Sequence, residues 1–435
     1  MDRVDEIRRE IDGVDLQILD ALARRRQLVA DVLAAKNESG GPLRDAMREE
    51  QLLASRIANG RDRGLDAHFV TRVFHEVIDD SVRAQQLRLV PEYAAADHKT
   101  VAFQGIEGAY SELAGRKFFA ASIDRTVFVG HPTFGDVVEA VEDGTTDFAM
   151  LPVENTTAGS INEVYDLLSC AQVSIVGEEV LRVEHCLLGV ADVPLTSLKR
   201  ILSHPQALAQ CMKFLAKLPG TEAQPYADTA MAVRLVKEQA DPTLAAIASE
   251  EAGRRYGLTV LRRNIEDQQH NFTRFVVIAR HPLTVDRRIP CKTSVVMATN
   301  HEEGSLLRAL NILHEYAINL TKLESRPIPG MPFQYLFYVD FEGNTADDRV
   351  QEALARVRTA TTSLKVLGSY PSQRRERTQP HVAALVTAPA QTAAPPAETA
   401  AVEKSRVSYR LASRGPGRGN TVIDIRGVKV GGPQF

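Results

Sequence analysis

A hydroxyl and a guanidinium stand where a polar loop of this sequence enters a buried strand. The stretch 268–271 is rich in amide and imidazole groups, and 272–278 is a β-branched run typical of a buried strand. In an α/β fold such a strand end usually faces a cleft, where the Thr273 hydroxyl could donate a hydrogen bond or a proton. The alternative is that Thr273 bonds a neighbouring carbonyl and Arg274 is a surface charge.

A second set of polar groups interrupts a long apolar helix, which is predicted over residues 4–36. Its heptad seam consists of Val4, Ile7, Ile11, Val14, Ile18, Ala21, Leu28 and Val32. At ~1.5 Å per residue the helix is about 50 Å long, so a partner chain is the simplest way to bury this seam. Arg25 lies at an a position within the seam, and Arg8 and Lys36 lie on the flanking e position. A lone cation in a seam is costly without a partner.

Two shorter helices follow, one over residues 45–59 and one that begins near Asp66 as its N-cap. Their notable polar side chains are Asp45, Arg48, Glu49, Ser81 and Gln85. In one interpretation an acidic residue of the second helix neutralises Arg25 in a simple dimerising hairpin. In the other, the cations and Gln85 form a buried pocket for a small dianion, and the repeated polar interruptions favour this pocket.

Residues 3–89 resemble the all-helical chorismate mutase domain of bifunctional P-proteins. The resemblance implies that Arg8 (from the partner subunit), Arg25 and Arg48 bind the substrate, that Lys36 and Gln85 bond its ether oxygen, and that Asp45, Glu49 and Ser81 surround its hydroxyl and carboxylates. Of these, Arg25, Lys36 and Gln85 are the expected catalytic groups. A Claisen rearrangement needs no nucleophile, only locked reacting arms and a stabilised ether oxygen. Arginine pairs and the Lys36–Gln85 donors suit those two tasks.

Strand and helix patterns alternate over residues 99–281, which predicts an α/β fold. The expected strands are 100–103, 127–129, 148–153, 173–180, 185–190, 200–202, 244–248 and 273–279. Hydroxyl or amide residues recur where strands hand over to helices, as in 105–111, 154–160 and 203–206. Each is individually an N-cap, but together they would direct several helix N-termini at one cleft that binds an anion.

These segments resemble the prephenate dehydratase domain, with the motifs G-x-x-G-x-Y-S, L-P-V-E-N-T-x-x-G-x-I, S-H-P-Q and N-F-T-R-F in order. The implied fold is two α/β lobes like those of type II periplasmic binding proteins. Gly105-Ile106 departs from the family's usual Gly-Pro. Prephenate loses CO2 and water together, so the implied role of Thr273 is to protonate or bond the departing hydroxyl. The implied substrate-binding residues are Ser111, Glu154, Asn155, Thr156, Ser203, Gln206, Gln210 and Arg274.

Residues 292–370 show the order βαββαβ, with strands expected at 293–298, 318–324, 334–341 and 363–370 and helices at 305–316 and 346–361. This order predicts an α+β ferredoxin-like unit. Two stretches, Gly304-Ser305-Leu306 and Glu324-Ser325-Arg326, resemble the phenylalanine-binding motifs of the ACT domain of P-proteins. In isolation they are a helix cap and a strand end. The resemblance implies that L-phenylalanine binds between two subunits and inhibits the dehydratase.

Composition bounds the remaining possibilities for this multidomain chain of 435 residues, which is divided at 1–90, 99–281, 292–370 and 371–435. The four cysteines form no C-x-x-C pair, and the histidines form no H-x-x-x-H pair, so no metal or cofactor is expected. A net charge of -4 gives no reason to expect nucleic acid. Without a signal peptide or an apolar run long enough for a membrane span, the expected location is cytoplasmic.

The tail, 371–435, is rich in Ala, Pro and Thr and is predicted to be disordered. Its end weakly resembles the leader strands of some DAHP synthases, which would make the chain a truncated larger fusion. The main hypothesis is a homodimeric or larger enzyme that acts on chorismate and prephenate, with L-phenylalanine as effector. Arogenate dehydratase activity and a non-catalytic amino-acid sensor are the alternatives. A sensor would need neither Thr273 nor the cation pocket.

Overall fold

The computed structural model describes residues 3–39, 46–89, 98–287, 289–328, 330–331 and 334–372. The predicted tail from residue 373 onward and Asp45 therefore lie outside the described residues, as does the side chain of Lys36. No helix in this described part of the chain is long and apolar enough to cross a bilayer.

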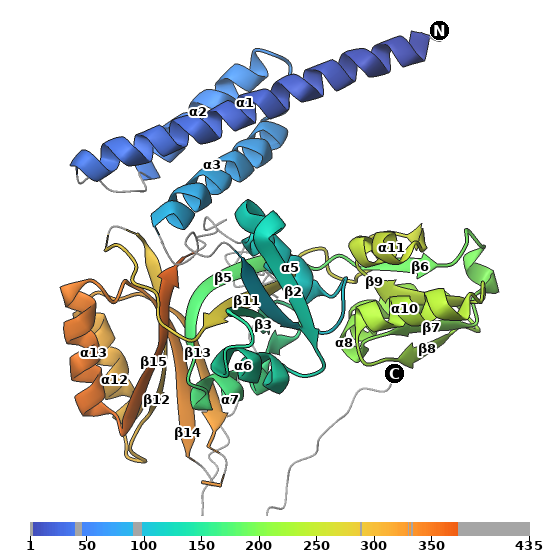
Figure 1. The fold of residues 1–435 in the computed structure, drawn as a ribbon. Coiled ribbons are helices and arrows are strands. Elements are labelled where there is room, and N and C mark those ends of the chain that lie inside the picture. The colour runs from blue at the N-terminus through green and yellow to red at the C-terminus, as the bar shows by residue number, and fades with distance from the viewer. Residues whose placement is uncertain are drawn as a thin grey trace, which may run out of the picture. The chain divides into compact units, whose positions relative to one another are not determined.

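Three helices form the first domain: α1 (Arg3–Ser39), α2 (Ala46–Arg61) and α3 (Ala67–Leu89) (Figure 1). Asp66 caps α3 as predicted, because its carboxylate accepts the backbone N–H of Phe69 at 2.9 Å. Helices α2 and α3 approach closely at Gly60, where a Cβ atom would stand 2.6 Å from Val70 Cγ2. The helical prediction for this segment is confirmed.

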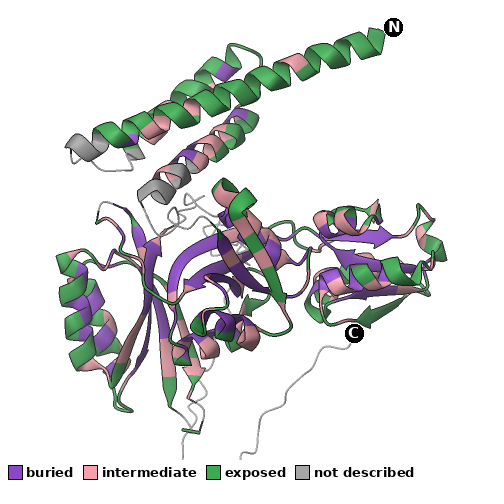
Figure 2. Ribbon diagram, viewed as in Figure 1, coloured by how far each residue is buried: buried purple, intermediate pink, exposed green. Residues whose placement is uncertain are grey.

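Lobe 1 is a mixed sheet of order β2-β1-β3-β11-β5, with the short β4 paired to β3. Its strands are β1 (Lys99–Gln104), β2 (Thr126–His131), β3 (Phe148–Asn155), β4 (Gly159–Ser160), β5 (Ser174–Arg182) and β11 (Phe272–Ala279), and its helices are α5 (Tyr110–Phe118), η1 (Ala120–Arg125), α6 (Phe134–Glu142) and α7 (Asn162–Cys170). Strands β3 and β11 are apolar runs because both faces of the sheet are covered, as Figure 2 shows by their burial.

Lobe 2 is a second sheet of order β10-β6-β9-β7-β8. Its strands are β6 (Cys186–Gly189), β7 (Arg200–Ser203), β8 (Glu222–Pro225), β9 (Leu244–Ala248) and β10 (Thr259–Arg262), and its helices are η2 (Leu195–Ser197), α8 (Pro205–Gln210), α9 (Met212–Leu215), α10 (Thr229–Gln239) and α11 (Glu250–Tyr256). Every residue of the central strand β9 is buried.

The chain crosses between the lobes twice, through 183–185 and back through 263–271. The two crossing segments are hydrogen-bonded to each other: Val183 donates to the Asn271 carbonyl at 2.8 Å, and Ile265 donates to the His185 carbonyl at 3.1 Å. Strand β11 begins where the second crossing re-enters lobe 1, so Thr273 lies at the junction of the lobes.

The third domain, 291–371, has the predicted order βαββαβ: β12 (Cys291–Ala298), α12 (Ser305–Glu315), β13 (Leu320–Pro327), β14 (Tyr335–Glu342), α13 (Asp348–Ala360) and β15 (Ser363–Pro371). Its antiparallel sheet runs β13-β14-β12-β15. One face packs under α12 and α13, and the other contributes Tyr338 and Tyr370 to a core shared with lobe 1. The contact is close at Gly368, where a Cβ atom would overlap the carbonyl of Ile175.

Candidate active sites

A cavity of about 390 Å³ lies between the two lobes. Of the residues predicted to form the dehydratase site, five line it: Ser111, Asn155, Gln206, Gln210 and Thr273. They come from both lobes: Ser111 is the second residue of α5, Asn155 ends β3, Thr273 is the second residue of β11, and the two glutamines lie on α8. The fold therefore brings together residues that are more than a hundred positions apart in the chain.

The hydrogen bond between Asn155 and the Thr273 hydroxyl has a defined donor and acceptor. The carboxamide oxygen of Asn155 accepts the backbone N–H groups of Thr157 and Ala158, at 3.0 and 2.9 Å. Since a backbone N–H only donates, this oxygen is identified, and the Asn155 nitrogen faces Thr273 Oγ1 at 2.9 Å. Thr273 thus accepts from Asn155, and among the described residues none accepts the hydroxyl's own hydrogen. That hydrogen is available to a molecule in the cavity.

Behind this pair lies a polar network that adds Asn271, His185 and Tyr110 to the predicted residues Asn155 and Gln210. Asn155 Nδ2 donates to Asn271 Oδ1 at 2.8 Å, and Asn271 Nδ2 donates to Gln210 Oε1 at 3.0 Å. His185 Nε2 lies 2.8 Å from the same Gln210 oxygen, and its Nδ1 lies 3.0 Å from the Tyr110 hydroxyl. Asn271 and Tyr110 belong to the motifs N-F-T-R-F and G-x-x-G-x-Y-S but were given no role in the site, whereas His185 has no local sequence signal.

The cavity carries little charge of its own. Among the described residues that line it, none is a lysine or an arginine. Burial raises the pKa of Asp228. This effect outweighs the hydrogen bonds that its carboxylate accepts from the backbone N–H groups of Met231 and Ala230, which lower the pKa. Burial also lowers the pKa of His204, which lies on the same lobe as Asp228. Hydrogen-bond donors and helix starts, rather than cationic side chains, therefore surround a bound anion.

Arg274 does not reach the cavity, so its predicted substrate-binding role is wrong. Successive side chains of a strand point to opposite faces, and Thr273 takes the cavity face. Arg274 points to the third domain, where it donates to Glu178 at 2.8 Å, to Asp340 at 2.6 Å and to the Tyr370 hydroxyl at 2.9 Å. Its role is to join β11 to the neighbouring sheet.

Three further predicted contacts of the dehydratase site are absent from the cavity lining. Glu154 is on the same face as Arg274 and pairs with Lys322 at 3.2 Å. Ser203 is fully buried and donates to the carbonyl of Ile247 at 2.5 Å. The Thr156 hydroxyl lies between the carbonyl of His270 and the N–H of Phe272, at 3.0 and 2.9 Å. These three side chains therefore stabilise the walls around the cavity and do not line it.

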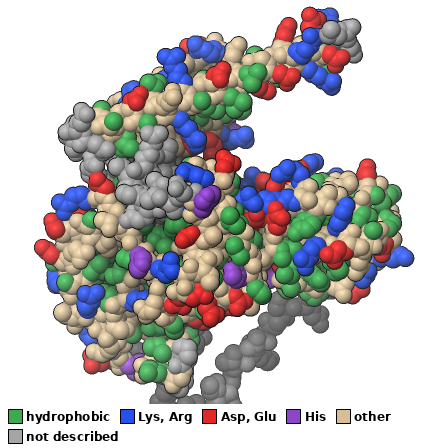
Figure 3. All heavy atoms as spheres, viewed as in Figure 1, with side chains coloured by type: hydrophobic (Ala, Val, Ile, Leu, Met, Phe, Trp, Pro, Cys, Tyr) green, Lys and Arg blue, Asp and Glu red, His purple; other side chains and the backbone are tan. Residues whose placement is uncertain are grey.

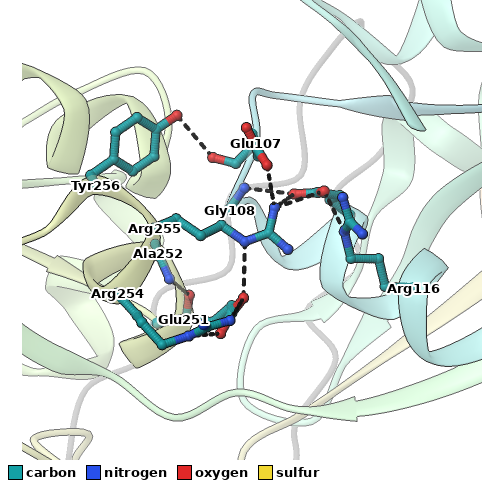
Figure 4. A network of polar contacts seen from close by, with 10 residues as sticks. Glu107, Gly108, Arg116, Glu251, Ala252, Arg254, Arg255 and Tyr256 are labelled. Atoms are coloured by element: carbon teal, nitrogen blue, oxygen red, sulfur yellow. Dashed lines mark hydrogen bonds and ion pairs between the residues drawn. The ribbon is translucent and has the colours of Figure 1, made fainter. Parts of the chain in front are cut away.

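An ion network beside the cavity joins the lobes (Figure 4). Glu112, on α5 of lobe 1, accepts from Arg116 at 2.6 Å and from Arg255 of α11 at 3.0 Å. Arg255 also binds Glu107 and Glu251, at 2.8 and 2.9 Å. The loop leading into α5 can approach α11 because Gly108 has a φ of +92°, and a Cβ there would stand 3.1 Å from Ala252. The network fixes the start of α5 against lobe 2.

In the helical domain, Arg25 and Ser81 are brought together. The Arg25 guanidinium donates to the Ser81 hydroxyl and, at 2.9 Å, to the carbonyl of Val77. Partial burial lowers the pKa of Arg25, whereas the negative charge of Asp80 raises it by a smaller amount. Asp80 itself binds Arg26 at 2.9 and 2.5 Å, and within the described residues Arg25 forms no ion pair. A half-buried cation is thus left for a ligand, as the pocket hypothesis requires.

The other predicted mutase residues are less converged. Gln85 and Glu49 are half-buried on α3 and α2, whereas Arg48 is exposed. The Arg8 side chain is 72% exposed, near Asp5 at 3.6 Å. Lys36 and Asp45 cannot be placed, because the side chain of one and all of the other lie outside the described residues.

The residues predicted to bind phenylalanine occupy two places in the third domain. Gly304, with a φ of +72°, caps α12, Ser305 is buried at its first turn, and Leu306 packs on the domain core. Glu324 accepts from the Ser160 hydroxyl of lobe 1 at 2.7 Å, and Arg326 binds Asp166 at 2.7 Å, whereas Ser325 is exposed. Glu324 and Arg326 therefore link β13 to lobe 1.

Comparison with known proteins bears on both sites. The prephenate dehydratase family model matches residues 101–283, and the chorismate mutase type II model matches residues 7–86. A bifunctional chorismate mutase/prephenate dehydratase from Enterobacter agglomerans is 42% identical over 369 residues, which cover 84% of this chain and 95% of that protein. The chain belongs to this bifunctional family.

Two other relatives are informative for the dehydratase part. The structure of a prephenate dehydratase from Arthrobacter aurescens in complex with L-Phe shares 30% identity with a TM-score of 0.58, over 63% of this chain and 90% of that one. Arogenate dehydratase 2 of Petunia hybrida is 44% identical over 286 residues, which cover 62% of this chain and 71% of that protein. In this bifunctional family member, the helical domain is the mutase part and the two lobes are the dehydratase part.

Proposed function

We propose that the chain converts chorismate to prephenate in its helical domain and prephenate to phenylpyruvate in the cavity between its lobes. The observation that carries the second step is the Thr273 hydroxyl, which accepts from Asn155 and keeps its hydrogen for the cavity. A hydroxyl so oriented can bond the departing ring hydroxyl of prephenate while water is excluded.

The dehydratase step needs one proton to be moved. The bond to the leaving carboxylate breaks and its electron pair enters the ring, while the C4–oxygen bond breaks and hydroxide leaves with a proton as water. Aromatisation drives the reaction, so the site must orient the substrate and stabilise the leaving hydroxyl. Thr273 serves the hydroxyl, and Gln206 and Ser111 line the walls against which the rest of the substrate lies. The reaction needs no added cofactor.

The mutase step needs two copies of the chain. Arg8 and Arg25 are seventeen residues apart (25 minus 8) on the single helix α1. That separation is about 25 Å along the axis at ~1.5 Å per residue, too far for both to bind one chorismate molecule. The seam of α1 exposes Ile7, Ile11 and Val14 by 48 to 55%, which suits a second copy that supplies Arg8. We place Lys36 and Gln85 at the ether oxygen of this shared site.

The third domain acts as an ACT regulatory domain that binds L-phenylalanine and lowers dehydratase turnover. Its βαββαβ order supports this role, as does the L-Phe complex of the Arthrobacter relative. The binding groups are the residues at the start of α12, Gly304 to Leu306, together with those at the end of β13, Glu324 to Arg326. Free thiols at all four cysteines suit a cytoplasmic enzyme.

One coupled assay tests the whole proposal. Chorismate is supplied to the purified chain without added cofactor, and prephenate and phenylpyruvate are measured with and without L-phenylalanine. Both products are expected, and phenylalanine should lower only the second. Prephenate that accumulates without phenylpyruvate would refute the dehydratase assignment, and unchanged rates at saturating phenylalanine would refute the regulatory one.

One observation favours arogenate as a second substrate. Arogenate carries an amino group where prephenate has a ketone, and the cavity lining includes the carboxyl group of Asp228 but no lysine or arginine. The likeness to the Petunia arogenate dehydratase agrees with this. Initial rates with prephenate supplied (phenylpyruvate measured) and with arogenate supplied (phenylalanine measured) give the two values of kcat/KM, and the larger one identifies the preferred substrate.

A further inference from the structure

We infer that His185 and Tyr110 are positioning residues of the dehydratase: together they fix the carboxamide of Gln210 and hold the amide network behind Thr273 in register. This inference rests on the proposed dehydratase function of the cavity. It follows from the direction of each hydrogen bond in the network, which can be worked out from the backbone outward.

The direction starts at Asn155, whose carboxamide oxygen is fixed by two backbone N–H groups. Its nitrogen therefore donates to Asn271, so the facing Asn271 atom is the oxygen, at 2.8 Å. The Asn271 nitrogen must then face Gln210 Oε1, at 3.0 Å. This places the Gln210 nitrogen toward the Thr157 hydroxyl at 2.6 Å and Asn155 Oδ1 at 3.2 Å.

The Gln210 oxygen has a second partner, His185 Nε2 at 2.8 Å. An amide oxygen only accepts, so this ring nitrogen must carry a hydrogen. Burial lowers the pKa of His185 and outweighs the opposite effects of Gln210 and Glu266, which raise it. The Glu266 carboxylate also accepts the His185 backbone N–H at 3.1 Å. The ring is then neutral near pH 7, and its Nδ1 is an acceptor.

Tyr110 faces that acceptor. Its hydroxyl donates to the carbonyl of Glu184 at 2.7 Å and shares that single hydrogen with His185 Nδ1, which lies 3.0 Å away. Burial raises the pKa of Tyr110 well above its usual range, with smaller contributions from Cys186, Cys211, Glu266 and Glu184, so the hydroxyl keeps its hydrogen. The two rings also pack edge to face with centroids 5.7 Å apart, which limits rotation of the imidazole.

The network unites four segments of the chain. Tyr110 begins α5 of lobe 1, Gln210 ends α8 of lobe 2, and His185 and Asn271 lie on the two crossing segments. Without the His185 hydrogen, Gln210 could rotate its amide and set nitrogen against nitrogen at Asn271 and oxygen against oxygen at Asn155. Such a displacement changes the alignment of Thr273 with the bound substrate more than it changes binding.

Three substitutions separate positioning from mere packing. His185→Leu removes the donor, and we expect kcat for prephenate to fall about 10- to 100-fold with KM within about threefold. His185→Gln can donate to Gln210 from the position of Nε2, so kcat should recover to within about fivefold of the wild type. Tyr110→Phe removes a single oxygen, and kcat should fall about three- to tenfold. Mutase turnover and thermal unfolding of the same samples report whether the chain is folded.

The tautomer gives a second, independent measurement. In ¹⁵N-histidine-labelled wild-type chain, the signal that His185→Gln abolishes should be that of a neutral ring with its hydrogen on Nε2. A hydrogen on Nδ1 alone, or folded Leu and Phe variants with wild-type kcat, would overturn the inference. A wild-type chain that converts neither prephenate nor arogenate would instead refute the proposed function, so the two failures are distinguishable.

Discussion

The Thr273 hydroxyl is the proposed donor to the departing hydroxyl in the dehydratase reaction. We expect Thr273→Ala to lower dehydratase kcat about 10²- to 10⁴-fold, the usual contribution of a positioned proton donor. Thr273→Ser keeps the hydroxyl beside Asn155 and should retain most turnover. The measurement is the rate of phenylpyruvate formation from prephenate, with mutase turnover as an internal reference. Equal rates in the Ala and Ser variants would exclude the hydroxyl from the reaction.

At the scale of single residues, the sequence was enough to predict which side-chain types belong to the site. It did not show to which face of a strand each side chain points. Thr273, Asn155 and Gln210 were predicted, and they converge on the cavity. Arg274 was assigned to substrate binding from the resemblance to the prephenate dehydratase domain, yet strand alternation sends its side chain to the face opposite Thr273. His185 could not be found, because its partner Gln210 is 25 positions away and on another lobe.

Strand β11 shows how one element serves two surfaces. On the face opposite Thr273, Arg274, Glu178, Lys292 and Asp340 form a buried network to which Ser294 and Tyr370 add hydrogen bonds. Lys292 donates to Glu178 at 2.7 and 2.9 Å, so each anion has a cation and each cation an anion. The third domain's sheet is therefore bonded directly to the residue next to Thr273.

The buried pair Arg274–Asp340 makes this contact sensitive to acid. Burial alone would raise the pKa of Asp340, but Arg274, Ser294 and Lys292 outweigh it and hold the pKa below its usual range. A carboxyl group with a lowered pKa in the folded state contributes stability above the unfolded pKa of about 3.9. That contribution is lost as the pH falls through the folded value.

Asp340→Asn should therefore destabilise the dehydratase–third domain unit by about 3 kcal/mol near pH 7, because Arg274 loses a buried partner. The difference from the wild type should begin to shrink as the pH falls below about 3.9, where Asp340 of the unfolded chain takes up a proton, and should disappear below the lowered pKa of the folded state. Urea unfolding followed by loss of dehydratase activity measures both effects. Asp348→Asn is the matched control, since Asp348 is 90% exposed in its pair with Arg287 and such pairs contribute little. An equal loss in both variants contradicts the prediction.

Element order was largely predictable because hydrophobic periodicity records burial, and the long buried strands β3, β5, β9 and β11 all have the expected place. The strands that were not predicted are short and more exposed. Strand β8, Glu222–Pro225, is exposed at every position and lies at the edge of its sheet, so its sequence carries no apolar pattern. Edge pairing of this kind is decided by the neighbouring strand β7.

At the scale of the whole molecule, the apolar seam of α1 is the surface that remains exposed. Apolar side chains are visible along this helix among charged ones in Figure 3, and Ile11 and Leu28 are 54% and 55% exposed. A seam this long on a helix of 37 residues exceeds what α2 and α3 cover. Because the seam also separates Arg8 from Arg25, the same association would bury apolar surface and complete the mutase site.

Ile11→Glu tests that association. A charge in the middle of the seam should prevent the proposed association of two copies and lower mutase kcat about 100-fold or more, because Arg8 of the second copy is withdrawn and one desolvated arginine contact contributes several kcal/mol. Dehydratase turnover of the same sample should stay within about twofold, since its cavity lies in residues 104–275 of one chain.

Leu16→Glu introduces the same charge on the same helix outside the a and d positions, at a side chain 63% exposed, and should leave both mass and mutase activity unchanged. Sedimentation equilibrium gives the mass, and a monomeric wild-type chain with full mutase activity would show that one copy is sufficient.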